Sequence, residues 1–203
     1  MKSLSEIETV SKRSSRASGF SWGIAEEVGK NIRILEMFGI AGIKNLNYYF
    51  KMRSEKKFED LILIGKDNKI SKLEICPIIA GLSFLDQIKP LEKLSEIKFE
   101  KIAFPLLFLP FVSRASEIVG KKLQLEIDKK IFLLNYNNSI YSNSLNNGVI
   151  EVGNNILIKF IENNDSFNKN EWKEIYKLSE ETFVEENENL KINSAGAGLT
   201  DND

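Results

Sequence analysis

The spacing of apolar residues changes along the chain, and this change limits the fold more than any other feature of the sequence. In the N-terminal part apolar side chains recur every three or four positions, as Ile24, Val28 and Ile32 do, which is the period of an amphipathic helix. From Leu61 onward the apolar residues gather in short runs separated by glycine and asparagine, which is typical of strands and turns. We therefore expect an α+β fold whose mainly antiparallel β middle is packed by N-terminal and C-terminal helices.

The length of 203 residues fits one domain that can bury an ordinary hydrophobic core. Our expectation is a single domain over residues 1–203. Its parts are a helical segment over 1–55, a β-rich segment over 60–162, and a C-terminal helix with a tail over 168–203.

Helix signals are clearest toward the two ends of the chain. Ser3 with Glu6, or Ser5 with Glu8, fits a capping box for a first helix that runs to about Ala17. The helices expected in the N-terminal segment cover about 3–17, 21–38 and 43–52. A last helix, capped by Asn168 or Asn170, carries one stripe formed by Trp172, Ile175, Tyr176, Ser179 and Phe183.

The β-rich segment divides into short runs joined by turn residues. Glycine and asparagine mark turns at 65–68 and 153–155, and an alternation of apolar and polar residues starts at Leu123. The expected hairpins pair 61–64 with 70–75, 123–127 with 131–134, and 149–152 with 156–161. Two intervening segments, 77–88 and 110–119, are expected to be short helices.

Composition excludes several kinds of chemistry. The chain has no histidine, which excludes Ser-His-Asp and Cys-His catalysis and every zinc site that needs imidazole. One cysteine, Cys76, is too few for an Fe–S cluster or a zinc finger, and we expect it to be a buried, unreactive thiol rather than a nucleophile. Motifs for NAD or ATP are missing, and the sequence gives no support for haem either.

Charge and hydropathy point to an expected cytoplasmic location. The N-terminus lacks an apolar leader segment, and the longest apolar run, 102–112, is too short to span a bilayer. A lone cysteine gives no reason to infer an oxidising compartment. The short apolar run also leads us to expect no membrane partner, and acids such as Glu36 interleave with the basic residues, so we expect no nucleic-acid partner.

The candidate site residues are carboxylates, arginines and one tryptophan. Glu26 or Glu27, beside Trp22, could act as a general base, or both could simply complement the dipole at a helix start. Arginines are scarce in this lysine-rich chain, so each is a candidate anion ligand, with surface or interdomain ion pairing as the alternative: Arg13, Arg16, Arg33, Arg53 and Arg114. An enzyme would use Arg16, Arg33 and Arg114 to bind its substrate. Asp201 and Asp203 lie in a tail that is either frayed in solvent or functional.

Two motifs give a resemblance to a known family. The segment 16–29 reads RASGFSWGIAEEVG and the last eight residues read GAGLTDND, while Cys76-Pro77-Ile78 and the run 105–111 add weaker similarity. Together they resemble an uncharacterised bacterial family, a domain of unknown function, over essentially the whole chain. The resemblance implies no activity. It does imply that a docked, functional tail is as good an expectation for these residues as a tail frayed in solvent.

Two functions fit these residues. In the first, the protein is a metabolic enzyme: arginines bind a small anionic metabolite, Glu26 or Glu27 transfers a proton, and the tail closes the pocket. In the second, it is a non-catalytic accessory subunit or interaction protein whose C-terminal tail docks on a protein partner. The chemical variety of the segment 22–27 and of the tail favours the first. We expect residues 194–203 to be ordered near the second helix, and the oligomeric state stays open.

Overall fold

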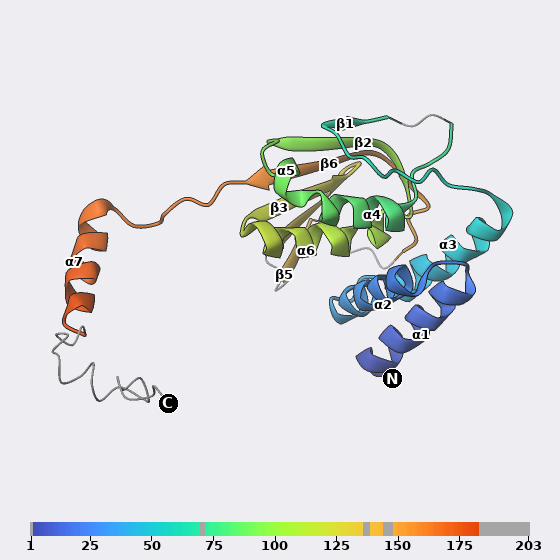
Figure 1. The fold of residues 1–203 in the computed structure, drawn as a ribbon, viewed down its shortest axis with the longest axis horizontal. Coiled ribbons are helices and arrows are strands. Elements are labelled where there is room, and N and C mark those ends of the chain that lie inside the picture. Colours follow the sequence, from blue (N-terminus) through green and yellow to red (C-terminus); the bar gives the residue numbers. More distant parts are fainter. Residues whose placement is uncertain (1, 70–71, 136–138, 144–147, 183–203) are drawn as a thin grey trace, which may run out of the picture. The chain divides into compact units, whose positions relative to one another are not determined.

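A computed structural model describes residues 2–69, 72–135, 139–143 and 148–182. The chain divides into two compact units, residues 1–163 and residues 164–203 (Figure 1). The first unit holds the sheet and most of the helices, and the second holds α7 (Lys169–Glu180). The sequence-based expectation of a single domain stays a prediction.

Three helices open the first unit, close to the predicted ranges: α1 (Leu4–Ala17), α2 (Trp22–Met37) and α3 (Gly42–Glu55). Of the two predicted alternatives, Ser3 caps α1, because its side chain accepts a hydrogen bond from the N–H of Glu6. The Ser21 side chain caps α2 in the same way and accepts from the N–H of Ile24. α1 and α2 pack closely where Gly29 meets α1, since a Cβ there would lie 2.8 Å from the carbonyl oxygen of Glu8.

Within the described residues, six strands form one mixed sheet in the order β1-β2-β6-β3-β4-β5. The strands are β1 (Asp67–Asn68), β2 (Glu96–Ala103), β3 (Lys122–Ile127), β4 (Lys130–Asn135), β5 (Ser139–Ser142) and β6 (Val152–Ile161). β1 runs parallel to β2, and the other neighbouring pairs are antiparallel. The predicted α+β class with a mainly antiparallel sheet is therefore confirmed.

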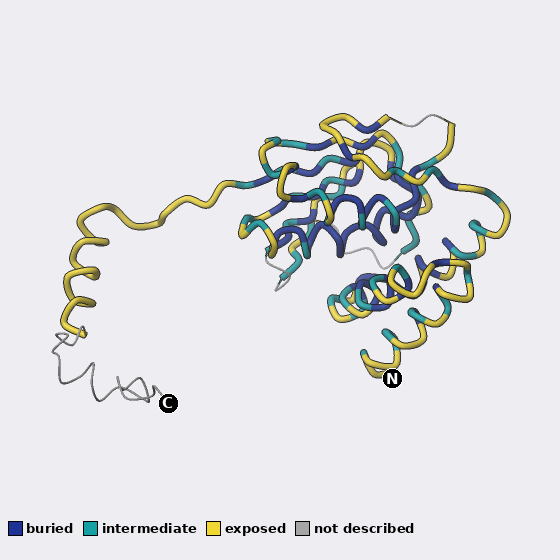
Figure 2. The backbone as a smooth tube through the Cα atoms, viewed as in Figure 1, coloured by how far each residue is buried: buried dark blue, intermediate teal, exposed yellow. Residues whose placement is uncertain are grey.

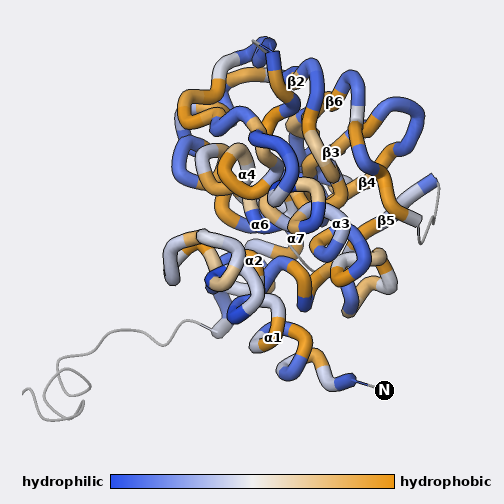
Figure 3. Tube along the Cα trace, turned by 90° about the vertical axis from the view of Figure 1, so that its right-hand side faces the viewer, coloured by the Kyte–Doolittle hydropathy of each residue, from blue (hydrophilic) through white to orange (hydrophobic). Residues whose placement is uncertain are grey.

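The helices that connect the strands along the chain cover one face of the sheet (Figure 1). These are α4 (Pro77–Asp86), α5 (Ile88–Leu91), the 3-10 turn η1 (Pro105–Leu107) and α6 (Leu109–Val119). Buried residues line the layer between them and the strands (Figure 2). In this core Phe108 contacts Phe84 and Phe99 at ring-centroid distances of 5.9 and 5.4 Å. Apolar residues are concentrated in the strands and these helices (Figure 3).

Two predicted hairpins are wrong. The segment 61–64 is an irregular loop, because the Gln87 amide donates a hydrogen bond to the Ile62 carbonyl and accepts one from the Ile64 N–H. β1 lies where the turn was predicted and pairs with β2. The segments 149–152 and 156–161 do not pair with each other, because residues 152–161 form the single strand β6, which pairs with β2 before and after Asn155. Asn155 itself has the left-handed conformation of a turn residue (φ 70°) within this strand. The predicted hairpin of β3 and β4 is confirmed, whereas β2 and β5 were not predicted.

Candidate functional site

The two predicted catalytic carboxylates lie in a network of ion pairs on the first unit. Glu26 contacts the ammonium groups of Lys12 and Lys30 at 3.3 and 3.2 Å. Glu27 contacts Lys30 at 3.0 Å and forms an ion pair with Arg114 of α6. The structure thus brings together three of the predicted site residues, from α2 and α6.

The network holds both carboxylates in the ionised form. Hydrogen bonds from Lys30 and Lys12 lower the pKa of Glu26. Partial burial acts to raise the pKa of Glu27, but the hydrogen bonds from Arg114 and Lys30 outweigh it, so this pKa is lowered as well. A general base works best with a pKa near the operating pH, and the shifts here run in the opposite direction.

The remaining predicted ligands have partners within the chain. Arg33 pairs with Glu8 at 3.1 Å. Arg16 donates to the Phe20 carbonyl at 3.1 Å, and its guanidinium lies 5.7 Å from the ring centroid of Trp22. The alternative interpretation of these arginines, surface ion pairing, thus describes Arg33 and Arg114. Asp201 and Asp203 lie outside the described residues, as does the predicted ordered tail 194–203, so their roles stay predictions.

A buried polar cluster surrounds the single cysteine. The Cys76 thiol lies 3.1 Å from the hydroxyl of Tyr49, and Arg53 donates to the same hydroxyl at 3.4 Å. The guanidinium of Arg53 also covers the ring of Phe20 at 4.3 Å. Burial raises the pKa of both Cys76 and Tyr49, so both groups are protonated at neutral pH. The predicted burial of Cys76 is confirmed, and its low reactivity stays a prediction.

Sequence reasoning missed the partners of Cys76. Tyr49 and Arg53 are four residues apart on α3, a spacing that places them on one helix face and was visible in the sequence. Their proximity to Cys76 was not visible, because 27 residues separate Tyr49 from the cysteine.

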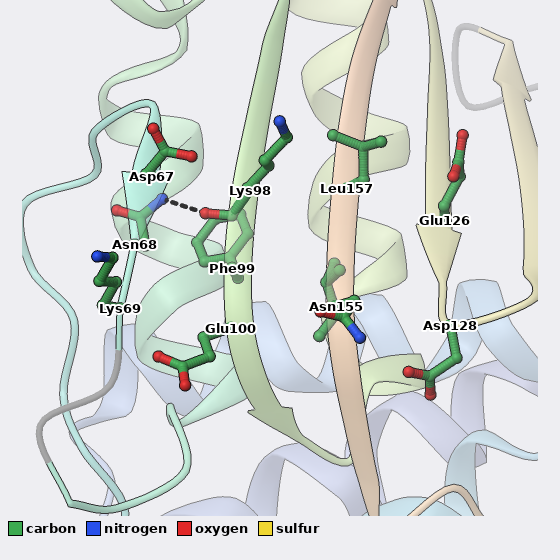
Figure 4. Close-up of a pocket in the computed structure, with 11 residues that line it drawn as sticks. Asp67, Asn68, Lys69, Lys98, Phe99, Glu100, Glu126, Asp128, Asn155 and Leu157 are labelled. Carbon is green, nitrogen blue, oxygen red and sulfur yellow. Dashed lines mark hydrogen bonds between the residues drawn. The ribbon is translucent and has the colours of Figure 1, made fainter.

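A separate pocket lies on the face of the sheet opposite α4 and α6. It is a groove of about 560 Å³ that crosses β1, β2, β6 and β3 (Figure 4). The half-buried side chain of Leu157 lies at its centre, with Lys98 of β2 and Glu126 of β3 as its cross-strand neighbours. Asp67 and Lys69 border one side of the groove, and Glu126 and Asp128 border the other (Figure 4).

Some charges beside the groove neutralise one another. Lys98 pairs with Glu96 at 2.8 Å, and Lys159 pairs with Glu126 at 2.7 Å. The hydrogen bond from Lys159 is the main cause that lowers the pKa of Glu126. Over the described ranges, no cluster of acids or cysteine has the arrangement needed to hold a metal ion. No helix in these ranges has the length and apolar character of a membrane span.

The second unit presents an apolar helix face to solvent. Among the described residues of α7 none is buried (Figure 2). Four large apolar side chains are more than half exposed: Trp172 at 54%, Ile175 at 64%, Tyr176 at 52% and Leu178 at 59%. Phe167, just before the helix, stacks on Trp172 with a centroid distance of 5.3 Å. The predicted stripe is present over 172–179, and its last predicted member, Phe183, lies outside the described residues.

Residues 2–74 match the model of a family described as a protein of unknown function (DUF3726). The match covers α1 to α3 and the loop up to Glu74, and it includes the segment 16–29 on which the predicted resemblance rested. The resemblance to a domain of unknown function is thereby confirmed for this part of the chain. No curated protein matches the chain, and no solved structure matches it.

Proposed function

We propose that this protein is a non-catalytic interaction protein that binds a partner protein through the apolar face of α7. This keeps the second class of function considered from the sequence, an interaction protein, but assigns the docking to α7 instead of the C-terminal tail. The observation that carries it is the exposed apolar face itself, because four large side chains on three turns of helix are more than half exposed. Aromatic residues such as Trp172 and Tyr176 are the side chains most often found at the energetic centre of protein interfaces.

Local contacts prepare α7 for binding. A helix of twelve residues is marginal in isolation, so its ends need stabilisation. The Asn168 side chain accepts hydrogen bonds from the N–H groups of Asn170 and Glu171 at 2.8 and 3.1 Å. The Glu171 carboxylate in turn accepts from the N–H of Asn168 at 2.7 Å, which completes a capping box. Pre-formed helix reduces the ordering entropy that binding must offset.

The charges on α7 favour a protein as the partner. The helix carries three lysines and three glutamates, so its polar face has no positive excess. Helices that bind anionic membranes have polar faces rich in lysine and arginine, and nucleic-acid surfaces need a basic excess too. Neither requirement is met by α7.

The width of the apolar face favours a partner that encloses α7 in a groove over one that pairs a single helix with it. With 100° between successive residues, the arc from Leu178 through Ile175 and Trp172 to Tyr176 spans about 160°. A coiled-coil seam is narrower, because it uses only two positions per heptad. Three turns of helix are also too short to bury the roughly 800 Å² per partner that stable complexes reach by pairing two helices. A partner groove that encloses the helix makes more contact with the same face.

The state of the predicted catalytic groups also supports a non-catalytic role. Glu26 and Glu27 have lowered pKa values because they form ion pairs. Arg114 is paired with Glu27 and is therefore not an unpaired cation that awaits a ligand. A small anionic metabolite would have to displace these contacts to reach Arg114. A cytoplasmic setting in a bacterium belongs to the same proposal and rests on the resemblance and on the single reduced cysteine.

The test compares two faces of one helix. Full-length protein with Trp172→Ala or Ile175→Ala tests the apolar face, and Lys173→Ala or Lys177→Ala is the matched control on the polar face. Partners that co-purify with the unaltered protein are identified, purified and titrated against all variants. We expect Trp172→Ala to weaken binding at least about 30-fold and each control to change it less than about threefold. Equal binding by the apolar-face and polar-face variants would contradict the proposal.

A further inference from the structure

Two arginine side chains meet at one buried residue of the first unit. The guanidinium of Arg16 donates to the carbonyl of Phe20 at 3.1 Å, and the guanidinium of Arg53 covers the ring of Phe20 at 4.3 Å. Phe20 is only 3% exposed and stacks on Tyr49 with a centroid distance of 6.5 Å, so this point is fixed in the core. Two positive charges, one from α1 and one from α3, are therefore held at the connection between α1 and α2.

Neither of these charges has a carboxylate partner within the part of the chain that the structure describes. Arg16 bonds a backbone carbonyl and Arg53 bonds the hydroxyl of Tyr49 at 3.4 Å, and both acceptors are neutral. Arg33 and Arg114, by contrast, are each paired with a glutamate. Arg53 is also half-buried, and a guanidinium withdrawn from water normally has an anionic partner. This points to an anion that a ligand supplies.

The two guanidinium groups have the hydrogen-bonding capacity for a phosphate group. The hydrogen bonds described above use only one of the several N–H donors on each guanidinium. A carboxylate is satisfied by the fork of a single arginine, whereas a phosphate group has three acceptor oxygens and close to two negative charges. Two arginines therefore match a phosphate group in both charge and donors.

An exposed tryptophan lies beside the two arginines. The ring centroid of Trp22 is 5.7 Å from the guanidinium of Arg16, and the side chain is 57% exposed. An indole with this exposure offers a flat apolar surface to the organic part of a ligand. Arg13 lies three residues before Arg16 on α1, so the two are neighbours on the helix surface and Arg13 adds positive charge nearby.

We propose that Arg16 and Arg53 bind the phosphate group of a small phosphate monoester whose organic part packs on Trp22. This changes the sequence-based choice of anion ligands, because it keeps Arg16 but replaces Arg33 and Arg114 with Arg53. The site goes beyond the binding function proposed for α7 and is independent of it.

The experiment titrates the full-length Trp172→Phe protein, in which Trp22 is the only indole, with phenyl phosphate and with inorganic phosphate at constant ionic strength. Calorimetry gives the Kd, and the emission of Trp22 reports binding at this site. We expect phenyl phosphate to bind with a Kd of about 1 mM or tighter. Inorganic phosphate should bind at least about threefold more weakly, because it makes no contact with the indole. Acetate at the same concentration should not bind.

Substitutions locate the site. Arg16→Gln and Arg53→Gln should each weaken the binding of phenyl phosphate about tenfold, as expected for the loss of charge-assisted hydrogen bonds. Arg33→Gln is the matched control, because it removes the same charge from an arginine that is paired with Glu8, and it should leave the Kd unchanged. Urea unfolding shows which variants are folded. If Arg53→Gln does not fold, Arg53→Lys keeps the charge without the fork and should weaken binding about threefold.

Three results would overturn the assignment: no binding of phenyl phosphate at millimolar concentration, equal affinity for phenyl phosphate and acetate, or an equal loss of affinity in Arg33→Gln. The Trp172→Ala variant separates this proposal from the previous one, because it should lose the protein partner and keep the binding of phenyl phosphate. If it keeps the partner while the Arg16 and Arg53 variants lose phenyl phosphate, only the proposal for α7 fails.

Discussion

Replacing Asn31 with leucine should make the protein more stable. Asn31 lies in α2 at 2% exposure, and neither its amide nitrogen nor its amide oxygen has a hydrogen-bond partner among the described residues. Its surroundings include Val28, Leu46, Ile78 and Phe111, together with a cavity of about 10 Å³. A polar amide in this setting loses its hydration without gaining a partner.

The expected gain follows from these contacts. Each buried unpaired polar atom costs about 1–3 kcal/mol, and leucine has the same branched shape without polar atoms. Leucine methyl groups are larger than the amide atoms, and the neighbouring cavity offers part of the room they need. We expect the free energy of unfolding to rise by about 1–3 kcal/mol, which corresponds to a rise in Tm of about 5 °C for a chain of this length.

A second buried asparagine provides the control. Asn45 of α3 is fully buried, but its side chain donates to the Ala41 carbonyl at 2.7 Å and accepts from the N–H of Ile150 at 3.4 Å. Asn45→Leu breaks these bonds and should lower the free energy of unfolding by about 1–3 kcal/mol. Urea unfolding followed by circular dichroism measures both variants. A destabilised Asn31→Leu protein would refute the reasoning, because it would show that the Asn31 amide is satisfied in the native state.

Three further predictions concern the first unit. Because the folded-state pKa of Glu27 is lowered below its ordinary value of 4.5, its ion pair with Arg114 stabilises the protein above that pH, and this contribution disappears as pH falls through the folded-state pKa. The Glu27→Gln protein should therefore unfold at a lower urea concentration than the unaltered protein at pH 7. Between pH 6 and about 3 it should lose less stability than the unaltered protein does; identical pH profiles of stability for the two proteins would contradict this. Gly81→Ala should lower the free energy of unfolding by about 1–3 kcal/mol, because a Cβ there overlaps the ring of Phe111 in α6. Gly23→Ala, in open space on α2, should leave the free energy of unfolding unchanged or raise it slightly in the same urea assay. The Cys76 thiol should react with a thiol reagent only as fast as the protein opens, and rapid labelling of the native protein would disprove its burial.

Local signals made the helices predictable. Ser3, Ser21 and Asn168 cap helices that begin beside them, since a cap depends on residues two or three positions away. The strand β2 carries a similar local signal, because Ile97 and Phe99 alternate with charged residues, and this signal could have been used.

Other features depend on contacts between distant parts of the chain. β6 continues through a sequence typical of a turn because its neighbour β2 pairs with it on both sides of Asn155, while β3 pairs with the part that follows Asn155. The ion pair of Glu27 with Arg114 joins residues 87 positions apart. The sequence therefore indicated both residues as candidates for a site, but it did not indicate that they pair with each other. The groove over Leu157 likewise forms only after β1, β2, β6 and β3 assemble.

The most direct test of the proposed function is whether a partner covers Trp172. The chain has two tryptophans, so a Trp22→Phe variant leaves Trp172 as the only indole. In the free protein its fluorescence should have the red-shifted emission of a water-exposed indole, and iodide should quench it readily, as its 54% exposure requires. Addition of the purified partner should shift the emission to the blue and protect it from iodide. A partner that binds tightly while the emission and quenching of Trp172 stay unchanged would contradict the assignment of α7 as the docking surface.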